Sequence, residues 1–408
     1  MLTNKKHKLS SKVWLEYKDK PLIGKGGAEI LEAIEKENSI SKAAESLGMS
    51  YRYVWNYLHD IQLTLEEPTV ETFKGGKSGG GGAAGTLTYA FGSELTAFEK
   101  QYPSITVAPH LFEGSSLVAQ DENLTQSLSL EAAADTTAMP TVLFPNLANY
   151  EIAFGQTQMV IIVNLHSSAG KELDNMWNAA KELTVNSTAW TTAWKNMFTL
   201  IALNTTTTVG VSNPFTDPSG FQAAGMIRLA GLYFFGNVTY LYDAIYNNPS
   251  RYVMANSEDD LVPLMQTDHI DFITSAYESN AIPQTANQTS LAWITLPTQV
   301  NLGVLGNTPY YNEANFDYTE LGATQSFVVN PVLYCVTIPM LSTNPAAATL
   351  FIQYLYTSAG QSILEKYGIT PFSQGIVWPA ANASNVPSVI KPYTVPVNST
   401  TISQFAGA

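Results

Sequence analysis

Small polar residues in the second half of the chain stand where the first turns of helices are expected. Ser93 precedes the segment 94–102, whose spacing of apolar residues predicts a helix. Ser115 and Ser116 follow Gly114 before another helical segment. A serine hydroxyl and the free backbone N–H groups of a first helical turn together can hold an anion. The sequence therefore offers two anion cradles, although a plain helix cap is the more frequent role of any single serine.

One acidic and one aromatic residue also stand at the ends of predicted elements. Asp217 lies just before Pro218 in a turn that leads into a helix, and Tyr277 lies near the end of the predicted strand 271–278. A tyrosine hydroxyl can donate a hydrogen bond to an oxyanion without a full positive charge. A carboxylate repels a dianion unless its oxygen binds the metal centre of that ion. Because Asp is a common residue at the start of a helix, Asp217 can also be a helix cap and nothing more.

The elements that must position these residues alternate between strands and helices from about residue 86, which predicts an open α/β sheet. Short runs of apolar and β-branched residues predict the strands, and Gly or Ser residues mark the turns into helices. The strands predicted in this way are 86–91, 105–107, 158–164, 271–278 and 334–339.

The two parts of the chain differ in charge. Residues 1–78 hold 12 of the 20 Lys and Arg residues and 11 of the 34 acidic ones, a formal charge of +1. Residues 79–408 carry −15, which completes the −14 of the whole chain. With 45% apolar residues in 408, the chain has room for two or three globular domains. The charge difference indicates two modules, and the function must be inferred from both.

Composition excludes several classes of protein. A single cysteine, Cys335, excludes an internal disulfide and a cysteine-ligated zinc ion. No apolar stretch reaches the roughly 18 residues of a membrane span. The basic residues near the N-terminus are not followed by the apolar segment of a secretory signal. We therefore expect a cytoplasmic protein.

The first module has the pattern of a hairpin followed by three helices. The segments 12–17 and 21–24 predict the hairpin, and Ile30, Leu31 and Ile34 form one face of the first helix. Ser41 and Ser50 can cap two further helices, which Gly48 separates. Two helices joined by a tight turn form a helix-turn-helix, whose second helix enters the major groove of DNA.

Residues of this second helix and of a Gly-rich run after it are candidates for DNA contact. Arg can bind guanine and Asn adenine through two hydrogen bonds, and Lys in a flexible wing can bind phosphate. The candidates are Ser50, Tyr51, Arg52, Asn56, Lys74 and Lys77. A protein-interaction module and a plain linker are the alternatives, and the module lacks the strong basic charge of many DNA-binding domains.

The first module resembles the winged helix-turn-helix of ModE-type molybdate-responsive regulators. The resemblance rests on three blocks, which are residues 12–16, 40–55 and 75–83. It implies operator binding as a homodimer, with residues 50–56 contacting the bases and the Gly-rich block in the wing. It also places the boundary of this domain at residue 84.

The second module resembles the type II periplasmic-binding-protein fold, specifically the archaeal molybdate/tungstate-binding proteins of ABC transporters. The segments that carry this resemblance are 212–221, 260–264, 271–272, 296–302 and 344–371. It implies a two-lobed α/β domain at 85–375, followed by a tail at 376–408. The first lobe would comprise 85–155 and 325–375 and the second 160–320. The chain would cross near 155–163 and return near 321–329.

Carried over residue by residue, the second resemblance implies oxyanion contacts at Ser93, Ser115 or Ser116, Asp217 and Tyr277. In the archaeal proteins two carboxylates bind the metal of the oxyanion and make it six-coordinate. Asp217 stands at one of these positions and is the candidate direct ligand, but Ala276 stands at the other. The coordination geometry and the choice of oxyanion therefore stay open. No covalent cofactor and no other metal is expected.

The leading hypothesis joins the two modules into a cytoplasmic transcriptional regulator. Molybdate or tungstate would close the cleft between the lobes and change the spacing of two DNA-binding heads in a homodimer. The alternatives are an oxyanion-binding component of an ABC transporter with a vestigial DNA-binding head, and a degenerate effector domain that only dimerises. An enzyme is the least expected class, because no nucleophile–base pair and no metal-ligand spacing is visible. The scattered histidines are His7, His59, His110, His166 and His269.

Overall fold

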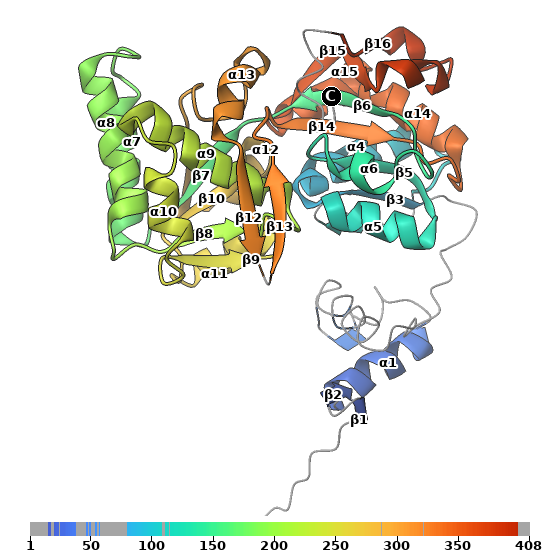
Figure 1. Ribbon diagram of the computed structural model, residues 1–408. Coiled ribbons are helices and arrows are strands. Elements are labelled where there is room, and N and C mark those ends of the chain that lie inside the picture. The colour runs from blue at the N-terminus through green and yellow to red at the C-terminus, as the bar shows by residue number, and fades with distance from the viewer. Residues whose placement is uncertain are drawn as a thin grey trace, which may run out of the picture. The chain divides into compact units, whose positions relative to one another are not determined.

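The computed structural model describes residues 15–17, 20–23, 25–37, 46–47, 49, 54, 57, 80–107, 111–113, 115–286, 288–320 and 322–398. Contacts within the chain divide it into two units, Met1–Lys74 and Gly75–Ala408. Figure 1 shows the helices and strands of each unit.

The first unit begins with a hairpin and a helix. Strand β1 (Leu15–Tyr17) pairs antiparallel with β2 (Lys20–Ile23), and α1 (Lys25–Glu37) follows. Ile30 and Ile34 of α1 pack with Val54 in a small buried cluster. The hairpin and the helix predicted from the sequence are confirmed. The six candidates for DNA contact, Ser50, Tyr51, Arg52, Asn56, Lys74 and Lys77, lie outside the described residues and stay predictions.

The described strands of the second unit form two main sheets, each the centre of one lobe. The sheet of the first lobe has the strand order β16-β15-β6-β14-β5-β3-β4. Its strands are β3 (Gly80–Ala84), β4 (Leu111–Glu113), β5 (Leu128–Ala133), β6 (Glu151–Gln156), β14 (Leu333–Thr337), β15 (Thr370–Trp378) and β16 (Thr394–Pro396). The helices that pack on it are α4 (Thr88–Gln101), α5 (Ser115–Thr125), α6 (Ala138–Val142), α14 (Pro345–Leu355) and α15 (Ser358–Lys366).

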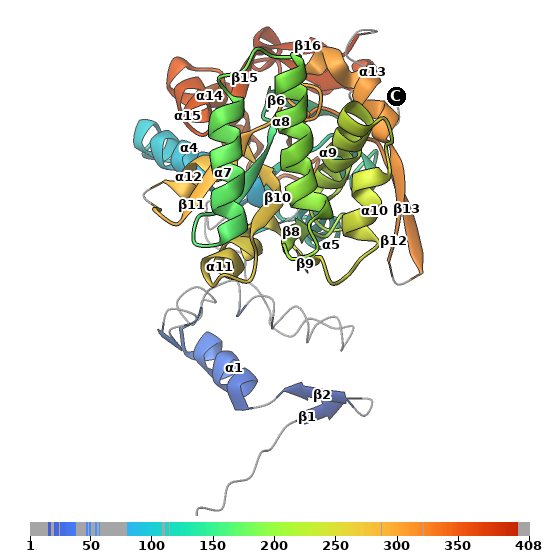
Figure 2. The ribbon, with the colours of Figure 1, turned by 90° about the vertical axis from the view of Figure 1, so that its left-hand side faces the viewer.

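The sheet of the second lobe has the order β11-β7-β10-β8-β9. Its strands are β7 (Met159–Asn164), β8 (Val209–Ser212), β9 (Tyr252–Ala255), β10 (Phe272–Tyr277) and β11 (Leu291–Thr295). Its helices include α7 (Ser168–Ala180), α8 (Thr188–Phe198), α9 (Pro218–Phe235), α10 (Tyr240–Tyr246), α11 (Leu261–Gln266), α12 (Glu278–Thr285) and α13 (Thr308–Tyr311). In Figure 2, α7, α8 and α9 lie in front of the strands of this lobe.

The chain passes between the lobes twice. It leaves the first lobe between β6 and β7, at Thr157 and Gln158, and returns after the hairpin of β12 (Phe316–Glu320) and β13 (Ala323–Phe327). The two-lobed type II architecture predicted from the sequence is confirmed. No described helix has the length and apolar character needed to span a membrane.

The first strand predicted for the second unit, residues 86–91, is wrong. The segment 86–91 forms the 3-10 turn η1 (Gly85–Leu87) and the start of α4, because Leu87, Ala90 and Phe91 are buried at helical spacing. The strand in this place is β3, from the Gly-rich run assigned to the wing, and it pairs in parallel with β4 and β5. Pairing on both sides stabilises a strand whose glycines have low intrinsic preference for one.

Two further predictions differ from the structure. Residues 105–107 form no strand, and the second strand of the chain's α/β pattern is β4. Strands β15 and β16 extend the first lobe into residues assigned to the C-terminal tail. By contrast, β7, β10 and β14 lie where the sequence predicts strands, and their residues are buried throughout.

Candidate functional site

Buried hydroxyl groups connect the two lobes. Tyr334, on β14 of the first lobe, and Ser279, in the first turn of α12, form a hydrogen bond of 2.6 Å between their hydroxyl oxygens. Tyr277, the last residue of β10, packs edge-on against Tyr334 with ring centroids 6.4 Å apart. Burial raises the pKa of both tyrosines, so their hydroxyls keep their protons and can donate. The Tyr277 hydroxyl donates to Gln222 Oε1.

Asp217 caps α9 at the edge of this group. Its Oδ1 accepts the N–H of Ser219 at 3.0 Å, and its Oδ2 accepts the N–H of Glu258 at 2.9 Å. Burial raises the pKa of Asp217, and these two hydrogen bonds oppose that rise. The turn needs Gly220, because a Cβ there would lie 2.5 Å from the carbonyl oxygen of Ser212. The helix-cap interpretation of Asp217 is confirmed.

Three buried serines connect the strands to this cap. Ser275 of β10 accepts the N–H of Ser212 at 2.9 Å and its hydroxyl proton at 3.0 Å. The Ser219 hydroxyl donates to Ser212 Oγ at 3.2 Å. The Ser-Gly pair after Asp217-Pro218 was the only sequence signal for this network, because Ser212 and Ser275 come from separate strands.

Glu258 is a buried carboxyl that sequence reasoning missed. It belongs to the 3-10 turn η3 (Glu258–Asp260), and its Oε2 accepts the Asn280 amide at 2.6 Å. Its Oε1 is buried, and no described residue makes a hydrogen bond of normal geometry to it. Burial raises the pKa of Glu258 well above its usual value, and the charges of Asp259 and Asp217 raise it further. A carboxyl held neutral in this way donates a hydrogen bond to an anion instead of repelling it.

The first lobe contributes the ends of its parallel strands. Because β3 is parallel to β4 and β5, their carboxyl ends meet at one edge, where ligands commonly bind in α/β sheets. Thr86, after β3, is buried. Its hydroxyl makes no hydrogen bond of normal geometry but lies close enough to the Tyr334 hydroxyl to lower the pKa of that group. Ser115, after β4, accepts the N–H of Ala134 at 3.0 Å.

Asp135 follows β5 at the same edge. Its Oδ1 accepts the N–H groups of Thr137 at 2.6 Å and of Ala138 at 2.8 Å, while Oδ2 is buried without a partner. The charges of Asp135, Asp217 and Glu258 each help to raise the pKa of Tyr277, which places these groups near one another. We call the whole set the interlobe cluster: Thr86, Ser115, Asp135, Asp217, Ser219, Glu258, Tyr277, Ser279 and Tyr334.

The structure places Asp217 near Tyr277, whose pKa its charge helps to raise, while Ser115 follows β4 in the first lobe and accepts the Ala134 N–H. Ser93 lies inside α4, which begins at Thr88 and not at the predicted position, and its hydroxyl is 2.7 Å from that of Tyr367. Ser116 lies in α5, and its side chain is outside the described part of the chain. The binding roles of all five residues stay predictions.

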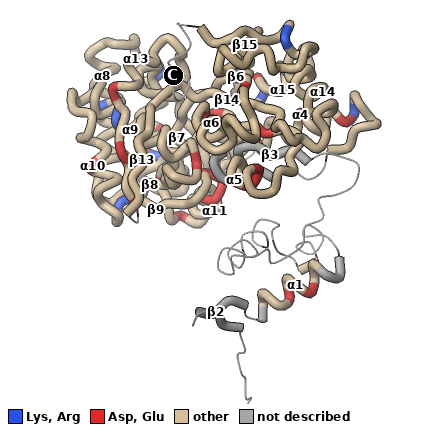
Figure 3. Tube along the Cα trace, turned by 45° about the vertical axis from the view of Figure 1, so that its right-hand side comes forward, with Lys and Arg blue, Asp and Glu red and all other residues tan. Residues whose placement is uncertain are grey.

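Neutral groups dominate the interlobe cluster. Charged side chains are sparse along the second unit in Figure 3. Arg251, a buried cation of this unit, donates to the carbonyl oxygens of Thr207, Ala202 and Ile201, away from the cluster. No described Lys or Arg contributes to the pKa shifts of Glu258, Tyr277 or Tyr334. An anion here would therefore be held by neutral hydrogen-bond donors.

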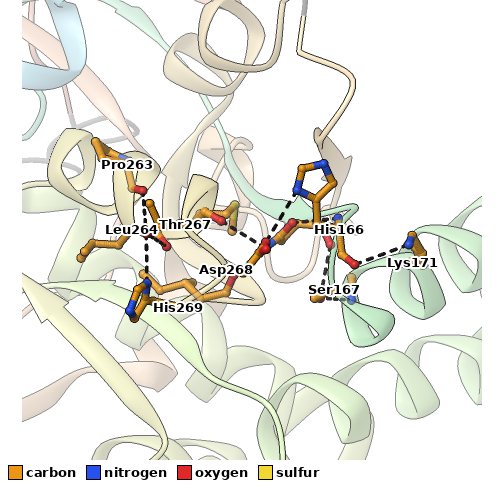
Figure 4. Close-up of polar contacts among 12 residues, drawn as sticks. His166, Ser167, Lys171, Pro263, Leu264, Thr267, Asp268 and His269 are labelled. Carbon is orange, nitrogen blue, oxygen red and sulfur yellow. Dashed lines mark hydrogen bonds and ion pairs between the residues drawn. The ribbon is translucent and has the colours of Figure 1, made fainter.

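Two histidines lie in a separate polar contact at the surface, shown in Figure 4. His166 Nδ1 is 3.7 Å from Asp268 Oδ1, which also accepts the Asn164 amide at 3.0 Å. His269 Nδ1 is 3.0 Å from the Thr267 hydroxyl. Within the residues that the structure describes, no group of three His, Cys, Asp or Glu side chains could hold a metal ion. We interpret these contacts as closing the turns after β7 and α11.

Comparisons with known proteins cover most of the second unit. The family model of bacterial extracellular solute-binding proteins matches residues 82–370. An uncharacterized solute-binding protein of Petrotoga mobilis is 27% identical over 287 residues, which cover 70% of this chain and 81% of that protein. The molybdate/tungstate-binding protein WtpA of Pyrococcus abyssi is 23% identical over 330 residues, 76% of this chain and 87% of the relative.

One solved structure shares the fold. The sulfate-binding protein SubI from Mycobacterium tuberculosis superposes with a TM-score of 0.50 at 13% identity, covering 79% of this chain and 94% of that one. At this identity the likeness concerns the fold alone.

Proposed function

We propose that this chain, which belongs to the family of bacterial extracellular solute-binding proteins, binds molybdate or tungstate between its two lobes. The observation that carries this proposal is the cluster of neutral donors contributed by both lobes, above all the contact between Ser279 and Tyr334. A ligand that accepts hydrogen bonds from this cluster would bind both lobes at once. The molybdate/tungstate-binding relative supports the choice of ligand.

The hydrogen bonds of Asp217 favour a tetrahedral oxyanion over expanded metal coordination. Both carboxylate oxygens already accept buried N–H groups, and a bond to the metal would compete with one of them. Ala276 stands where the resemblance implies a second carboxylate, and its methyl group lies in the core. We therefore infer that hydroxyl and N–H groups hold the ion and that Asp217 positions them.

The relatives favour a solute-binding component of a transporter over a transcriptional regulator. The family match starts at residue 82, and the relatives compared are solute-binding proteins. Regulation in the cytoplasm by a DNA-binding homodimer is the second candidate. It is supported by the confirmed hairpin, helix α1 and buried Val54 of the first unit.

Thermal melting of the full chain with molybdate, tungstate, sulfate or phosphate tests the ligand. An ion that binds only the native state raises Tm, with a gain of about 2.7 kcal/mol at a hundredfold excess over Kd. A rise with molybdate or tungstate that is much larger than with phosphate supports the proposal. Equal shifts with all four ions, or none with any, would overturn it.

Selection from a random DNA duplex library tests the second candidate. The full chain should enrich a sequence motif, and the double variant R52A/N56A should not, because it lacks both candidate base contacts. Enrichment that is the same for both proteins, or that is absent, rejects DNA recognition through this segment.

A further inference from the structure

A second polar space lies where the chain passes between the lobes. It is a cavity of about 160 Å³, which we call the hinge cavity. Gln156 and Thr370 line it from the first lobe, Glu278 and Gly303 line it from the second, and Thr157 and Gln158 are the crossing itself. Any ligand in this cavity would contact both lobes without touching the interlobe cluster.

The hinge cavity contains one charge that lacks a counterion. Glu278 is the only lining residue with an ionisable side chain, and no described Lys, Arg or His pairs with it. The Gln158 amide donates to Glu278 Oε2 at 2.9 Å, and no hydrogen bond to Oε1 is present among the described residues. Burial raises the pKa of Glu278 while that hydrogen bond lowers it, as expected for a carboxylate short of partners.

A second oxygen beside this carboxylate is also uncommitted. The Gln156 amide nitrogen donates to the Gly303 carbonyl at 3.4 Å, so the amide oxygen, Oε1, is the free end of the side chain. That oxygen is buried without a hydrogen-bond partner. The neighbouring amide of Gln158 is already fixed, because its Oε1 accepts from Asn301 at 2.5 Å. Glu278 and Gln156, which line the cavity from different lobes, thus each have one side-chain oxygen to which no hydrogen bond is made among the described residues.

These features define the chemistry of an occupant. A carboxylate, an amide oxygen and nearby carbonyl groups are the ligands of hard cations, and no His or Cys lines the cavity to favour a transition metal. Water occupies about 30 Å³ per molecule in the liquid, so the volume admits an ion that keeps several waters. We propose that the hinge cavity binds a hard, oxygen-ligated cation through Glu278 and Gln156, and that this cation joins the two lobes at the hinge. The site is independent of the oxyanion proposed above.

Melting of the full chain without any oxyanion tests the proposal. CaCl2, MgCl2, KCl and NaCl are compared at one ionic strength, with N-methylglucamine chloride as the reference. A single carboxylate predicts weak, millimolar-range binding, and 10 mM Ca²⁺ or about 0.1 M of a monovalent ion should raise Tm by about 2–4 °C. The salt that gives the rise identifies the ion.

Three variants decide where the ion binds. E278Q keeps an acceptor for Gln158 but loses the charge, and it should lose the rise in Tm. E182Q, which removes one exposed carboxylate of the second lobe, is the matched control and should keep it. Q156E adds a carboxylate and should tighten cation binding at least tenfold, which tests the site even where E278Q does not fold. An equal rise in wild type and E278Q, no rise with any salt, or no gain in Q156E overturns the proposal.

Discussion

Tyr277 and Glu278 are neighbours in the chain, yet their side chains belong to two polar regions of opposite character. Tyr277 lies in the interlobe cluster, where hydroxyl and amide groups are fully buried and nearly all are paired. Glu278 lies in the hinge cavity, which is more open and contains an unneutralised carboxylate. The junction of β10 and α12 therefore supplies a donor to the first region and a charge to the second.

Burial decides which kind of ion each region suits. Complete burial raises the pKa of Glu258 in the interlobe cluster well above its usual value, so this carboxyl resists gaining a charge that would repel an anion. Glu278 is only partly buried and keeps more of its contact with water, so its charge is available to a cation. The same residue type, glutamate, thus has opposite consequences for binding in the two regions.

The largest difference between variants of the two regions is expected in their free energy of unfolding. D217A would leave the N–H groups of Ser219 and Glu258 buried without acceptors, and each costs about 1–3 kcal/mol. We expect the free energy of unfolding in urea to fall by about 3 kcal/mol, against less than about 1 kcal/mol for E278Q. Equal losses for the two variants would show that the cap is not what distinguishes the regions.

The next largest difference is expected in ligand binding, because a variant of one region should leave the ligand of the other unaffected. Y277F removes a buried donor and leaves Gln222 Oε1 unpaired, so molybdate should bind about 10–100-fold more weakly by calorimetry. The rise in Tm with Ca²⁺ or K⁺ should be unchanged in this variant. Y393F, which alters a partly exposed tyrosine, is the control. Loss of both responses in Y277F would mean that the two regions are one site.

Comparing variants of Thr86 and Ser93 tests which of the two residues belongs to the interlobe cluster. T86V keeps the shape of the side chain but removes a hydroxyl beside Tyr334, and it should weaken molybdate binding about tenfold. S93A removes a hydroxyl inside α4 that contacts Tyr367, and it should change the affinity less than about twofold. The opposite order would restore Ser93 as the anion contact.

The two affinities should respond to pH in opposite directions. As pH rises through the elevated pKa of Glu258, the carboxyl gains a charge that repels the oxyanion, and molybdate affinity falls. As pH rises through the pKa of Glu278, the carboxylate forms and cation affinity increases. Titrations of each affinity against pH should show the two trends, each of them severalfold or less. E258Q should flatten the first and leave the second, and parallel trends would contradict the assignment.

The sequence alone predicted the features that depend on residues close together in the chain. Runs of apolar residues predicted β7, β10 and β14, because a strand buried on both faces is apolar along its whole length. The Asp217-Pro218 turn marked the start of α9, since a side chain that caps a helix acts within three residues. The change in charge near residue 78 indicated two modules from composition alone.

Only the tertiary structure could decide the rest, because it depends on contacts between distant segments. A glycine run became β3 through pairing with β4 and β5, so Thr86 and not Ser93 follows the first strand of the sheet. Glu258 and Tyr334 joined Tyr277 from separate elements, and burial by all of them set the protonation of the cluster. Strand pairing and desolvation act across the fold, and no local pattern in the sequence encodes either one.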